Sequence, residues 1–416
     1  MKIDIQDIGV LMTMSGAVQK KGIGIDESDL GLVEKACVQI QDGKIVYAGP
    51  SVNAPDFQPD QTLSANGNAV MPGLVDAHTH LVFSGSRVKE FVARSRGATY
   101  QEIAEAGGGI NATVSATTYS SENDLIRPAR DRAKRMMALG DTCIEVKSGY
   151  GLSIIAEIKI LRAIKSLNES NECPRLIPTF LGAHAVPVEF KSNPDRYVDL
   201  IINEMLPMVK EQGLAEFCDV FCEPGYFTIE QSRKILSAAK NLGFKLKIHA
   251  DEFEPYGGAK LAAELKATSA DHLLAIDDEG IAALAGNDVT AVVLPASSLI
   301  LRKNSHAPAR KMIDAGVRVA LATDFNPGSS PCESLPLVAS LGIALCKMTV
   351  PEALCAVTLN GAYAVGLANR KGAVISSYDA DLILLNVMHP FELIYWIGRN
   401  MVKELIINGK IVKIRH

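Results

Sequence analysis

The stretch PGLVDAHTHLVF, from Pro72 to Phe83, places two of the chain's eight histidines one residue apart, directly after an apolar run. The run reads as a buried strand, and side chains two residues apart on a strand point to the same side. His78 and His80 would then project together, with Cα atoms roughly 6.6 Å apart, so that both imidazoles could bind one metal ion. An isolated pair of this kind fits one buried and one surface histidine equally well. Its meaning therefore depends on the rest of the chain.

Strand-like runs and helical patterns alternate on both sides of this stretch, from about residue 65 to residue 370. Between the runs lie amphipathic stretches such as ENDLIRPARDRAKRMMALG and TIEQSRKILSAAKNLG, which end at glycine. The alternation predicts an α/β fold, a (β/α)8 TIM-like barrel, with an open doubly wound sheet as the alternative. The eight predicted strands are NAVMPGLVDAH, DTCIEVKSGYG, PRLIPTFLGAH, FCDVFCEPG, FKLKIHADEF, TSADHL, VTAVVLPAS and VRVALATDF.

Short strands and tight turns fill the two ends of the chain. KACVQIQDGKIVYAG turns at Asp42-Gly43 and KELIINGKIVKI turns at Asn408-Gly409, and both dipeptides are strong hairpin signals. Neither end has enough strands to close a core of its own. The sequence thus predicts a small β-sandwich domain built from residues 1–64 and 371–416, with the barrel of residues 65–370 inserted between its halves.

Composition limits the possible partners and compartment. The net charge of −5 comes without a basic run, which argues against nucleic acid and anionic membranes and favours a small-molecule substrate. The eight cysteines include no CxxC pair, a pattern that suits a reducing cytoplasm. The N-terminal segment lacks a signal-peptide core, and no charge-free apolar run reaches the roughly 18 residues of a membrane span. We expect a cytoplasmic protein.

Polar residues end several of the predicted barrel strands. His249 ends FKLKIHADEF, His272 ends TSADHL and Asp324 ends VRVALATDF. Alone, each could be a satisfied core group or a turn cap. In a parallel barrel the carboxyl ends of all strands meet at one rim, so His78, His80, His249 and Asp324 would surround one cation. Zinc or iron suits this nitrogen and oxygen set, and such an ion can convert water to a hydroxide nucleophile near neutral pH.

The segments VMPGLVDAHTHLVF, KIHADEF and ATDFNPGSSP resemble the amidohydrolase superfamily, over nearly the whole chain. The resemblance implies a metal-dependent hydrolase on a (β/α)8 barrel, with a small β domain from both termini and a homodimeric assembly. It extends to one branch through FSGSRVKEF, GGGINATV, EVKSGYGL, FLGAHAVP, HADEFEPYGGAKLAAEL and LATDFNPGSSP. That branch hydrolyses the cyclic amide C–N bond of 4-imidazolone-5-propanoate to N-formimidoyl-L-glutamate, in histidine degradation.

The resemblance also implies roles for individual residues. It assigns the metal to the same four side chains, and it gives Arg87 the propanoate carboxylate, since a guanidinium can bond both oxygens. Without the resemblance, Arg87 reads as a solvated charge at a helix start, and Tyr150 and the loop from Asn326 to Ser329 read as plain turn residues. The remaining residues that would line the substrate pocket are Tyr150, Asn326, Gly328 and Ser329, with His184 and Glu252.

Three further groups are candidate proton handlers: His184, Glu252 and His272. Lactam hydrolysis needs a base for water, a group to polarise the carbonyl and an acid for the leaving nitrogen. We hypothesise that the bound water loses its proton to His272 or Asp324. His184 would stabilise the developing oxyanion, and Glu252 would engage a ring nitrogen. The assignment of these steps to residues stays open at this stage.

A second metal is one alternative, since some relatives bridge two ions with a lysine on the fourth barrel strand. Here that strand, FCDVFCEPG, has no lysine, and Lys147 falls on the second. We therefore expect a single ion and an acidic partner for Lys147. Glu223 reads either as a support for the site or as a plain strand-end carboxylate.

Two other functions remain as alternatives. A deaminase of a heterocyclic amine could use the same metal chemistry, although Arg87 indicates an anionic substrate. A non-catalytic assembly protein could keep the barrel and lose the chemistry, although the intact set of predicted ligands argues against this. The choice between zinc and iron stays open, because both accept such ligands.

Overall fold

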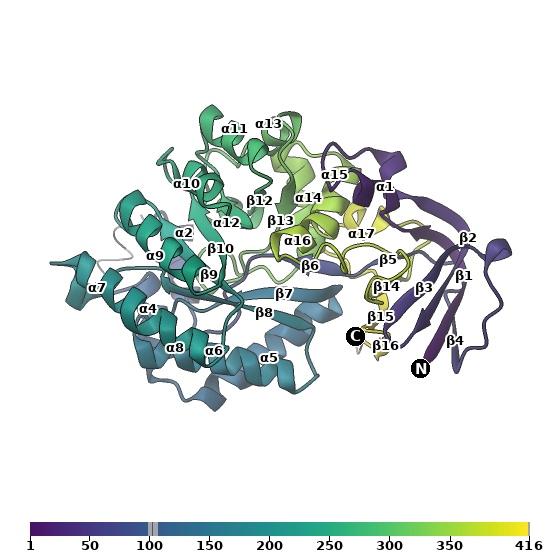
Figure 1. Cartoon of the computed structure of the whole chain (residues 1–416), viewed down its shortest axis with the longest axis horizontal. Coiled ribbons are helices and arrows are strands. Elements are labelled where there is room, and N and C mark those ends of the chain that lie inside the picture. The colour runs from purple at the N-terminus through teal and green to yellow at the C-terminus, as the bar shows by residue number, and fades with distance from the viewer. Residues whose placement is uncertain (99–101, 103–106, 415–416) are drawn as a thin grey trace.

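Eight parallel strands follow one another around a barrel in chain order in the computed structural model, which describes residues 1–98, 102 and 107–414 (Figure 1). This order confirms the predicted barrel and rules out the doubly wound sheet, whose strand order reverses. Each of the eight predicted runs supplies one strand of this barrel sheet. They are β6 (Leu74–Asp76), β7 (Asp141–Lys147), β8 (Arg175–Ala183), β9 (Phe217–Cys222), β10 (Lys245–Ala250), β11 (Ser269–His272), β12 (Thr290–Val293) and β13 (Val319–Leu321).

The barrel closes through the backbone that follows its first and last strands. The Asp324 N–H donates to the His78 carbonyl at 3.0 Å, and the His80 N–H donates to the Phe325 carbonyl at 2.9 Å. Thr79 and Phe325 form a parallel bridge at the same place. The seam is therefore made by the segments that carry three of the predicted metal ligands.

Helices cover the outside of the barrel (Figure 1), and their ends follow local sequence signals. α9 begins at a capping box in which Thr228 and Gln231 bond each other's backbone, and Ile235, Leu236 and Ala239 form its buried side. The helices of the described residues are α1 (Ser15–Gln19), α2 (Val88–Ser95), α4 (Ile110–Tyr119), α5 (Glu122–Ala138), α6 (Ile154–Glu169), α7 (Pro194–Leu200), α8 (Leu206–Glu211), α9 (Ile229–Asn241), α10 (Gly258–Leu265), α11 (Asp278–Gly286), α12 (Pro295–Ile300), α13 (Ala309–Asp314), α14 (Leu335–Cys346), α15 (Val350–Ala356), α16 (Leu359–Ala364) and α17 (Glu392–Tyr395).

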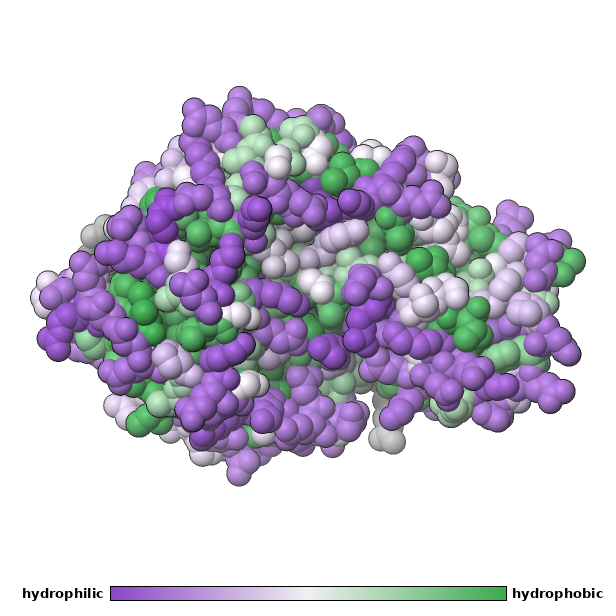
Figure 2. Space-filling view, in the orientation of Figure 1, coloured by the Kyte–Doolittle hydropathy of each residue, from purple (hydrophilic) through white to green (hydrophobic). Residues whose placement is uncertain are grey.

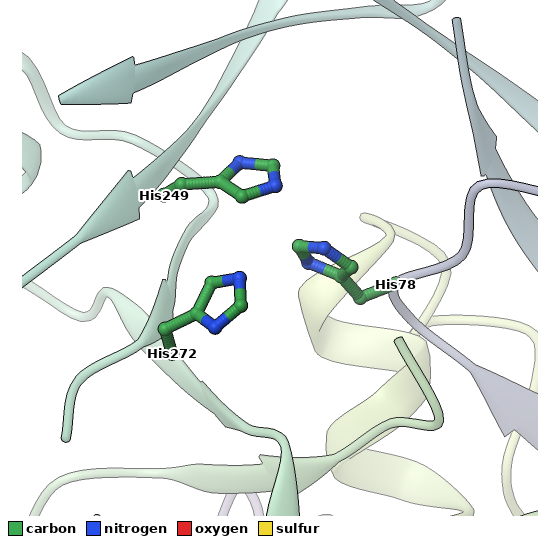
Figure 3. A group of neighbouring side chains, drawn as sticks. All are labelled: His78, His249 and His272. Carbon is green, nitrogen blue, oxygen red and sulfur yellow. The ribbon is translucent and has the colours of Figure 1, made fainter. Parts of the chain in front are cut away.

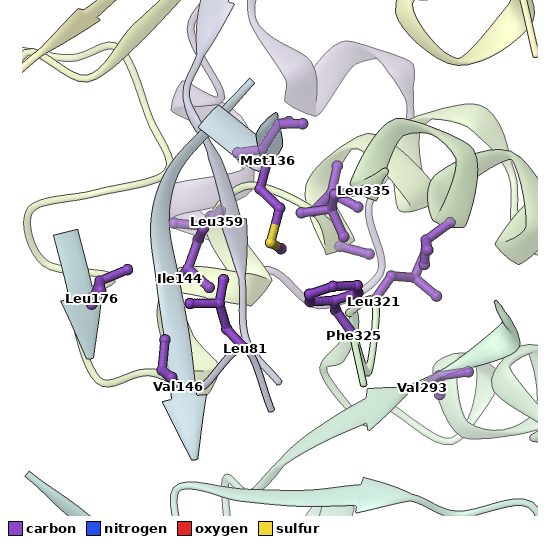
Figure 4. Close-up of a cluster of buried hydrophobic side chains, with 14 of the residues drawn as sticks. Leu81, Met136, Ile144, Val146, Leu176, Val293, Leu321, Phe325, Leu335 and Leu359 are labelled. Carbon is purple, nitrogen blue, oxygen red and sulfur yellow. The ribbon is translucent and has the colours of Figure 1, made fainter. Parts of the chain in front are cut away.

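Two apolar layers hold the barrel together. The outer one joins strands to helices: Ile144 and Leu321 from the sheet belong to one buried cluster with Met136, Leu335 and Leu359 from α5, α14 and α16 (Figure 4). The inner one takes one side chain from most strands and therefore lies inside the barrel. Its strand members are Val75, Cys143, Ile177, Phe217, Val292 and Ala320. The face of the molecule in Figure 2 is mostly hydrophilic, with apolar residues interspersed. Among the described helices, none has both the length and the apolar character needed to cross a membrane.

Strands from both ends of the chain pair in a second sheet at one end of the molecule (Figure 1). Both predicted hairpin turns are present, with positive φ at Asp42-Gly43 and at Asn408-Gly409. The pairing joins all its strands into one mixed sheet of order β16-β15-β14-β5-β1-β2-β3, with β4 beside β1. The strands are β1 (Lys2–Met12), β2 (Leu32–Gln41), β3 (Lys44–Pro50), β4 (Gln61–Ser64), β5 (Val70–Pro72), β14 (Leu382–Leu385), β15 (Val402–Ile407) and β16 (Lys410–Lys413).

The run from Asn68 to His78 serves both sheets. Its first part is β5, which pairs with β1 and β14, and its second part is β6 of the barrel. Gly73 lies between the two strands. A side chain is excluded at this position, because a Cβ there would lie 2.2 Å from Thr142 Oγ1. The domain limits at 64/65 and 370/371 stay a prediction, and β5 lies beyond the first of them while pairing with the terminal sheet.

Candidate metal and substrate site

A cavity of about 750 Å³ opens at the carboxyl ends of the barrel strands. His78 lies fully buried beside it, with no exposed surface. The other predicted site residues line the cavity, together with residues that were not predicted. The predicted ones are His80, Arg87, Tyr150, His184, His249, Glu252, His272, Asp324, Asn326, Gly328 and Ser329.

Imidazoles and a carboxylate crowd together at the base of this cavity. His78, His249 and His272 each offer one atom within 4.8 Å of the others, and Figure 3 shows their rings grouped around a common space. His78, His80 and Asp324 form a second group of the same kind. The structure thus brings all four predicted ligands together, and it places His272 next to them as a fifth candidate.

Two buried carboxylates orient two of these rings. His78 Nδ1 lies 2.6 Å from Asp271 Oδ2, and His249 Nδ1 lies 3.1 Å from Asp219 Oδ1. Because a carboxylate accepts, each Nδ1 carries the proton and each Nε2 keeps its lone pair. Both Nε2 atoms are buried and have no hydrogen-bond partner among the described residues. Unpaired imidazole lone pairs beside a carboxylate are what a zinc or iron ion binds, so these residues fit the metal implied by the family resemblance.

Two buried lysines balance the charge of these carboxylates. Lys147 Nζ lies 2.8 Å from both Glu145 and Asp219, which confirms the expected acidic partner. Burial opposes its charge, but Asp219 and Glu145 hold the pKa of Lys147 above the usual value of a lysine. Lys247 Nζ donates to Ser269 at 2.7 Å and lies 3.8 Å from Asp271. The histidines therefore rest on a layer of paired charges inside the barrel.

Burial dominates the titration of the side chains in the cavity. It raises the pKa of Asp324 to about 6, and with the charge of Asp324 it raises the pKa of Glu252 to about 8. Burial, followed by the neighbouring His249, lowers the pKa of His184 to about 3, and burial lowers that of His272 well below 6.5. At neutral pH the site therefore combines neutral imidazoles, whose lone pairs can accept hydrogen bonds, with a glutamic acid that can donate a proton.

His184 differs from its expected role. Its Nδ1 lies 2.9 Å from the Gly149 carbonyl, so Nδ1 donates there and the neutral ring keeps an acceptor at Nε2. The ring stacks on His80, with centroids 5.0 Å apart. Stabilising an oxyanion would need a donor, which this ring provides only when protonated. His184 is thus better suited to accept a hydrogen bond from an N–H of the substrate.

A loop holds the position of Asp324. Asn326 Oδ1 accepts the N–H groups of Gly328 and Ser329 at 2.8 Å each, and Asn326 Nδ2 donates to Ser329 Oγ at 2.8 Å. The Ser329 hydroxyl in turn donates to Asp324 at 3.4 Å. Asn326 therefore shapes the loop, and because it also lines the cavity, its expected contact with substrate stays a prediction.

Glu223 supports the site through the backbone of Glu252, which was one of the two roles expected for it. A Glu223 carboxylate oxygen accepts the N–H of Glu252. The neighbouring Asp251 accepts N–H groups from Tyr256 to Ala259 at 2.8 to 3.1 Å, which fixes the loop. His272, Asp324 and Asp251 adopt positive φ, a strained conformation typical of functional sites.

Sequence reasoning missed the carboxylates Asp219 and Asp271 and the lysine Lys247. For Asp219, the signal that could have found it is an ionisable residue inside an otherwise apolar strand, FCDVFC. Such residues are rarely buried unless they are paired. Glu90 and Arg94, which lie near Arg87, were missed as well, because helix-surface charges of this kind are common.

Comparisons with known proteins agree with this geometry. A model of the amidohydrolase family matches residues 221–412. The imidazolonepropionase of Geobacillus kaustophilus is 47% identical over 407 residues, which cover 97% of this chain and 96% of that protein. The imidazolonepropionase of Phocaeicola vulgatus is also 47% identical, over 97% of both chains.

Solved structures show the same fold. An adenosine deaminase from Xanthomonas campestris with bound zinc aligns with a TM-score of 0.72 at 20% identity, covering 98% of this chain and 92% of its own. A 5-methylcytosine deaminase from Klebsiella pneumoniae aligns with a TM-score of 0.74 at 17% identity, covering 100% of this chain and 98% of its own. At such identities the likeness is one of architecture alone.

Proposed function

This chain belongs to the imidazolonepropionase family of the amidohydrolases, and from that premise we propose that His78, His80, His249 and Asp324 hold one metal ion for the opening of an imidazolone ring. The enzyme is a metal-dependent hydrolase of cyclic amide C–N bonds. Its proposed reaction converts 4-imidazolone-5-propanoate to N-formimidoyl-L-glutamate. The observation that carries the site proposal is the pair of buried Nε2 atoms on His78 and His249, for which no described residue is a hydrogen-bond partner.

When bound, zinc or iron supplies a Lewis acid that polarises the carbonyl and activates water. The protein side chains handle the protons. His272, neutral at pH 7, accepts a proton from the attacking water, with Asp324 as the other candidate. Glu252 is protonated near neutral pH and donates to the ring nitrogen as the C–N bond breaks. His272 Nδ1 lies 3.6 Å from Glu252 Oε2, so acceptor and donor are neighbours.

The substrate would be oriented from two sides. Arg87 binds the propanoate carboxylate, and His184 accepts a hydrogen bond from a ring N–H. Tyr150 lines the same cavity as His80, with the two ring centroids 5.6 Å apart, and from there it would pack against the substrate ring. Burial raises the pKa of Tyr150, so its hydroxyl stays neutral.

The test is hydrolysis of freshly generated 4-imidazolone-5-propanoate, followed as loss of its ultraviolet absorbance and with the product identified as N-formimidoyl-L-glutamate. Dihydroorotate and guanine serve as controls. We expect turnover of the imidazolone alone. Ammonia release from guanine would favour a deaminase, and inactivity of the metal-loaded protein on all three would favour the non-catalytic alternative.

We also propose a cytoplasmic homodimer that binds neither nucleic acid nor membranes and that uses zinc or iron. The cysteines, all eight within the described residues, are free, which suits a reducing compartment. The mild net charge of −5 supports the absence of polyanionic partners. Elemental analysis of the protein purified from its natural host tests the metal, and sedimentation velocity tests the dimer.

A further inference from the structure

An ion pair stands at the cavity wall formed by Arg87. Glu90 follows Arg87 by three residues in the first turn of α2. Its Oε2 accepts hydrogen bonds from Arg87 Nε at 2.9 Å and Nη2 at 2.7 Å. The two side chains are only 11% and 12% exposed. Arg87 lines the cavity, whereas Glu90 is absent from its described lining and stands behind the arginine.

Glu90 is itself held from a second direction. Its Oε1 accepts the N–H of Gly109 at 2.9 Å. Gly109 precedes α4 and has a φ of 78°, a conformation that favours glycine. The carboxylate is therefore fixed between the starts of α2 and α4, and it cannot simply follow the arginine if the arginine moves.

This pairing leaves one edge of the guanidinium available. Arginine has five N–H donors in a planar fork, and Glu90 takes the Nε edge. The Nη1 and Nη2 edge remains, and no other described residue is hydrogen-bonded to it. That edge matches the two oxygens of a carboxylate.

Gly328 provides the space for this orientation. A Cβ on Gly328 would lie 2.0 Å from Arg87 Nη1 and 2.4 Å from Cζ, so any side chain there would displace the guanidinium. On the other side, Arg94 Nη2 donates to the Gly328 carbonyl at 2.8 Å. The loop and the position of Arg87 are therefore coupled.

We infer that Glu90 is a positioning residue, which holds the outer edge of Arg87 toward the cavity and so selects substrates with a carboxylate tail. Because the pair carries no net charge, this selection depends on geometry more than on an electrostatic excess. The inference rests on the proposed binding of the propanoate by Arg87.

The test compares Glu90→Ala with Glu90→Gln, which keeps one acceptor oxygen for Arg87 but removes the charge and the acceptor for the Gly109 N–H. For 4-imidazolone-5-propanoate, we expect Glu90→Ala to raise KM about 10-fold with kcat within about 2-fold, as for lost binding that is equal in ground and transition states. Glu90→Gln should keep KM within about 3-fold. For the analogue with a propanamide tail, neither substitution should change KM.

Gly328→Ala provides an independent test, because it displaces Arg87 and leaves Glu90 in place. It should raise KM more for the acid than for the amide, and the ratio of the two KM values is the readout because Gly328 itself lines the cavity. If Glu90→Ala fails to fold, as judged by circular dichroism, Glu90→Asp replaces it, because the shorter side chain cannot hold both Arg87 and the Gly109 N–H, and the same rise in KM for the acid is expected.

The possible failures are distinguishable. If Arg87→Met raises KM and Glu90→Ala does not, the positioning role is wrong and the proposed function stands. If Arg87→Met leaves KM unchanged, the proposed carboxylate contact itself is wrong. An equal rise in KM for acid and amide, or a fall in kcat alone, would overturn the inference in favour of a general structural role.

Discussion

His272 is the residue whose role the geometry leaves most sharply divided, because it lies among the candidate ligands and beside Glu252. If His272 is a base and not a metal ligand, its replacement should lower kcat by about 10²- to 10⁴-fold. We therefore expect His272→Ala to retain its full metal content while losing turnover. Metal analysis and kinetics on one preparation check this. A parallel loss of metal and activity would make His272 a ligand.

Asp219 orients the proposed ligand His249 and also pairs with Lys147. Replacing it by asparagine keeps the size of the side chain and removes the acceptor charge that fixes the imidazole. We expect Asp219→Asn to lower metal affinity by about 10- to 100-fold. Competition with a chromogenic chelator measures the affinity. Asp195→Asn, at an exposed carboxylate, is the control, and equal affinities in both variants would contradict the orienting role.

Asp141 carries a pH dependence unrelated to catalysis. It is fully buried, and neither carboxylate oxygen has a hydrogen-bond partner among the described residues. Burial, and then the charge of Asp76, raises the pKa of Asp141 well above its usual value. The unfolded chain ionises this group near pH 4, so its contribution to stability is complete below that pH. The contribution is lost as the pH rises, at up to ~1.4 kcal/mol per pH unit.

Asp141→Asn cannot ionise and should remove this pH dependence. The unmodified chain should lose stability between pH 5 and pH 8, whereas the variant should not lose this contribution. The free energy of unfolding of the variant minus that of the unmodified chain should therefore rise by at least ~1 kcal/mol over this range. Urea denaturation at both pH values measures it, with exposed Asp131→Asn as the control. A difference that stays constant with pH would show that Asp141 is ionised in the folded protein.

At the scale of elements, the metal site depends on the seam between the first and last barrel strands. The Thr323 hydroxyl donates to Asp76 Oδ2 at 2.6 Å across this seam. Thr323→Val removes that bond and leaves a buried carboxyl less satisfied, which should lower stability by about 1–3 kcal/mol. Thermal and urea unfolding should show the loss, and Thr62→Val, on the exposed strand β4, should not. An equal loss of stability in Thr323→Val and Thr62→Val would mean that the hydrogen bond from Thr323 to Asp76 does not stabilise the seam.

The sequence was sufficient for most elements because buried parallel strands are continuous apolar runs and hairpins carry distinctive turn residues. It was not sufficient for the division of the run from Asn68 to His78 into β5 and β6. That run is apolar throughout, and the division depends on the contact of Gly73 with Thr142, a neighbour distant in sequence.

The same limit applies to the site. The candidate ligands could be proposed from strand ends, since a barrel brings these to one rim. The pairing of His78 with Asp271 spans 193 residues, so it follows only from the closed barrel, which brings the end of β6 and the side chains of β11 together across its interior. The role of His184 depends on its bond to Gly149, which again no local pattern indicates.

At the scale of the whole molecule, the two sheets are linked directly. β5 pairs with strands from both ends of the chain and continues through Gly73 into β6, which leads to His78 and His80. The terminal sheet thus anchors the segment that carries two of the proposed ligands. The polar ligand layer then rests on the charged layer of Lys147 and Lys247, and Lys247 lies over the Phe217 ring of the apolar layer.

The central claim is that one metal ion is held jointly by His78, His80, His249 and Asp324. Anomalous diffraction from crystals of the metal-loaded protein, collected at the zinc and iron edges, tests it most directly. The account predicts a single anomalous peak bonded to these four side chains, with His272 outside the ligand set. A second peak, a peak bonded to His272 in place of Asp324, or no peak in this cavity would contradict it.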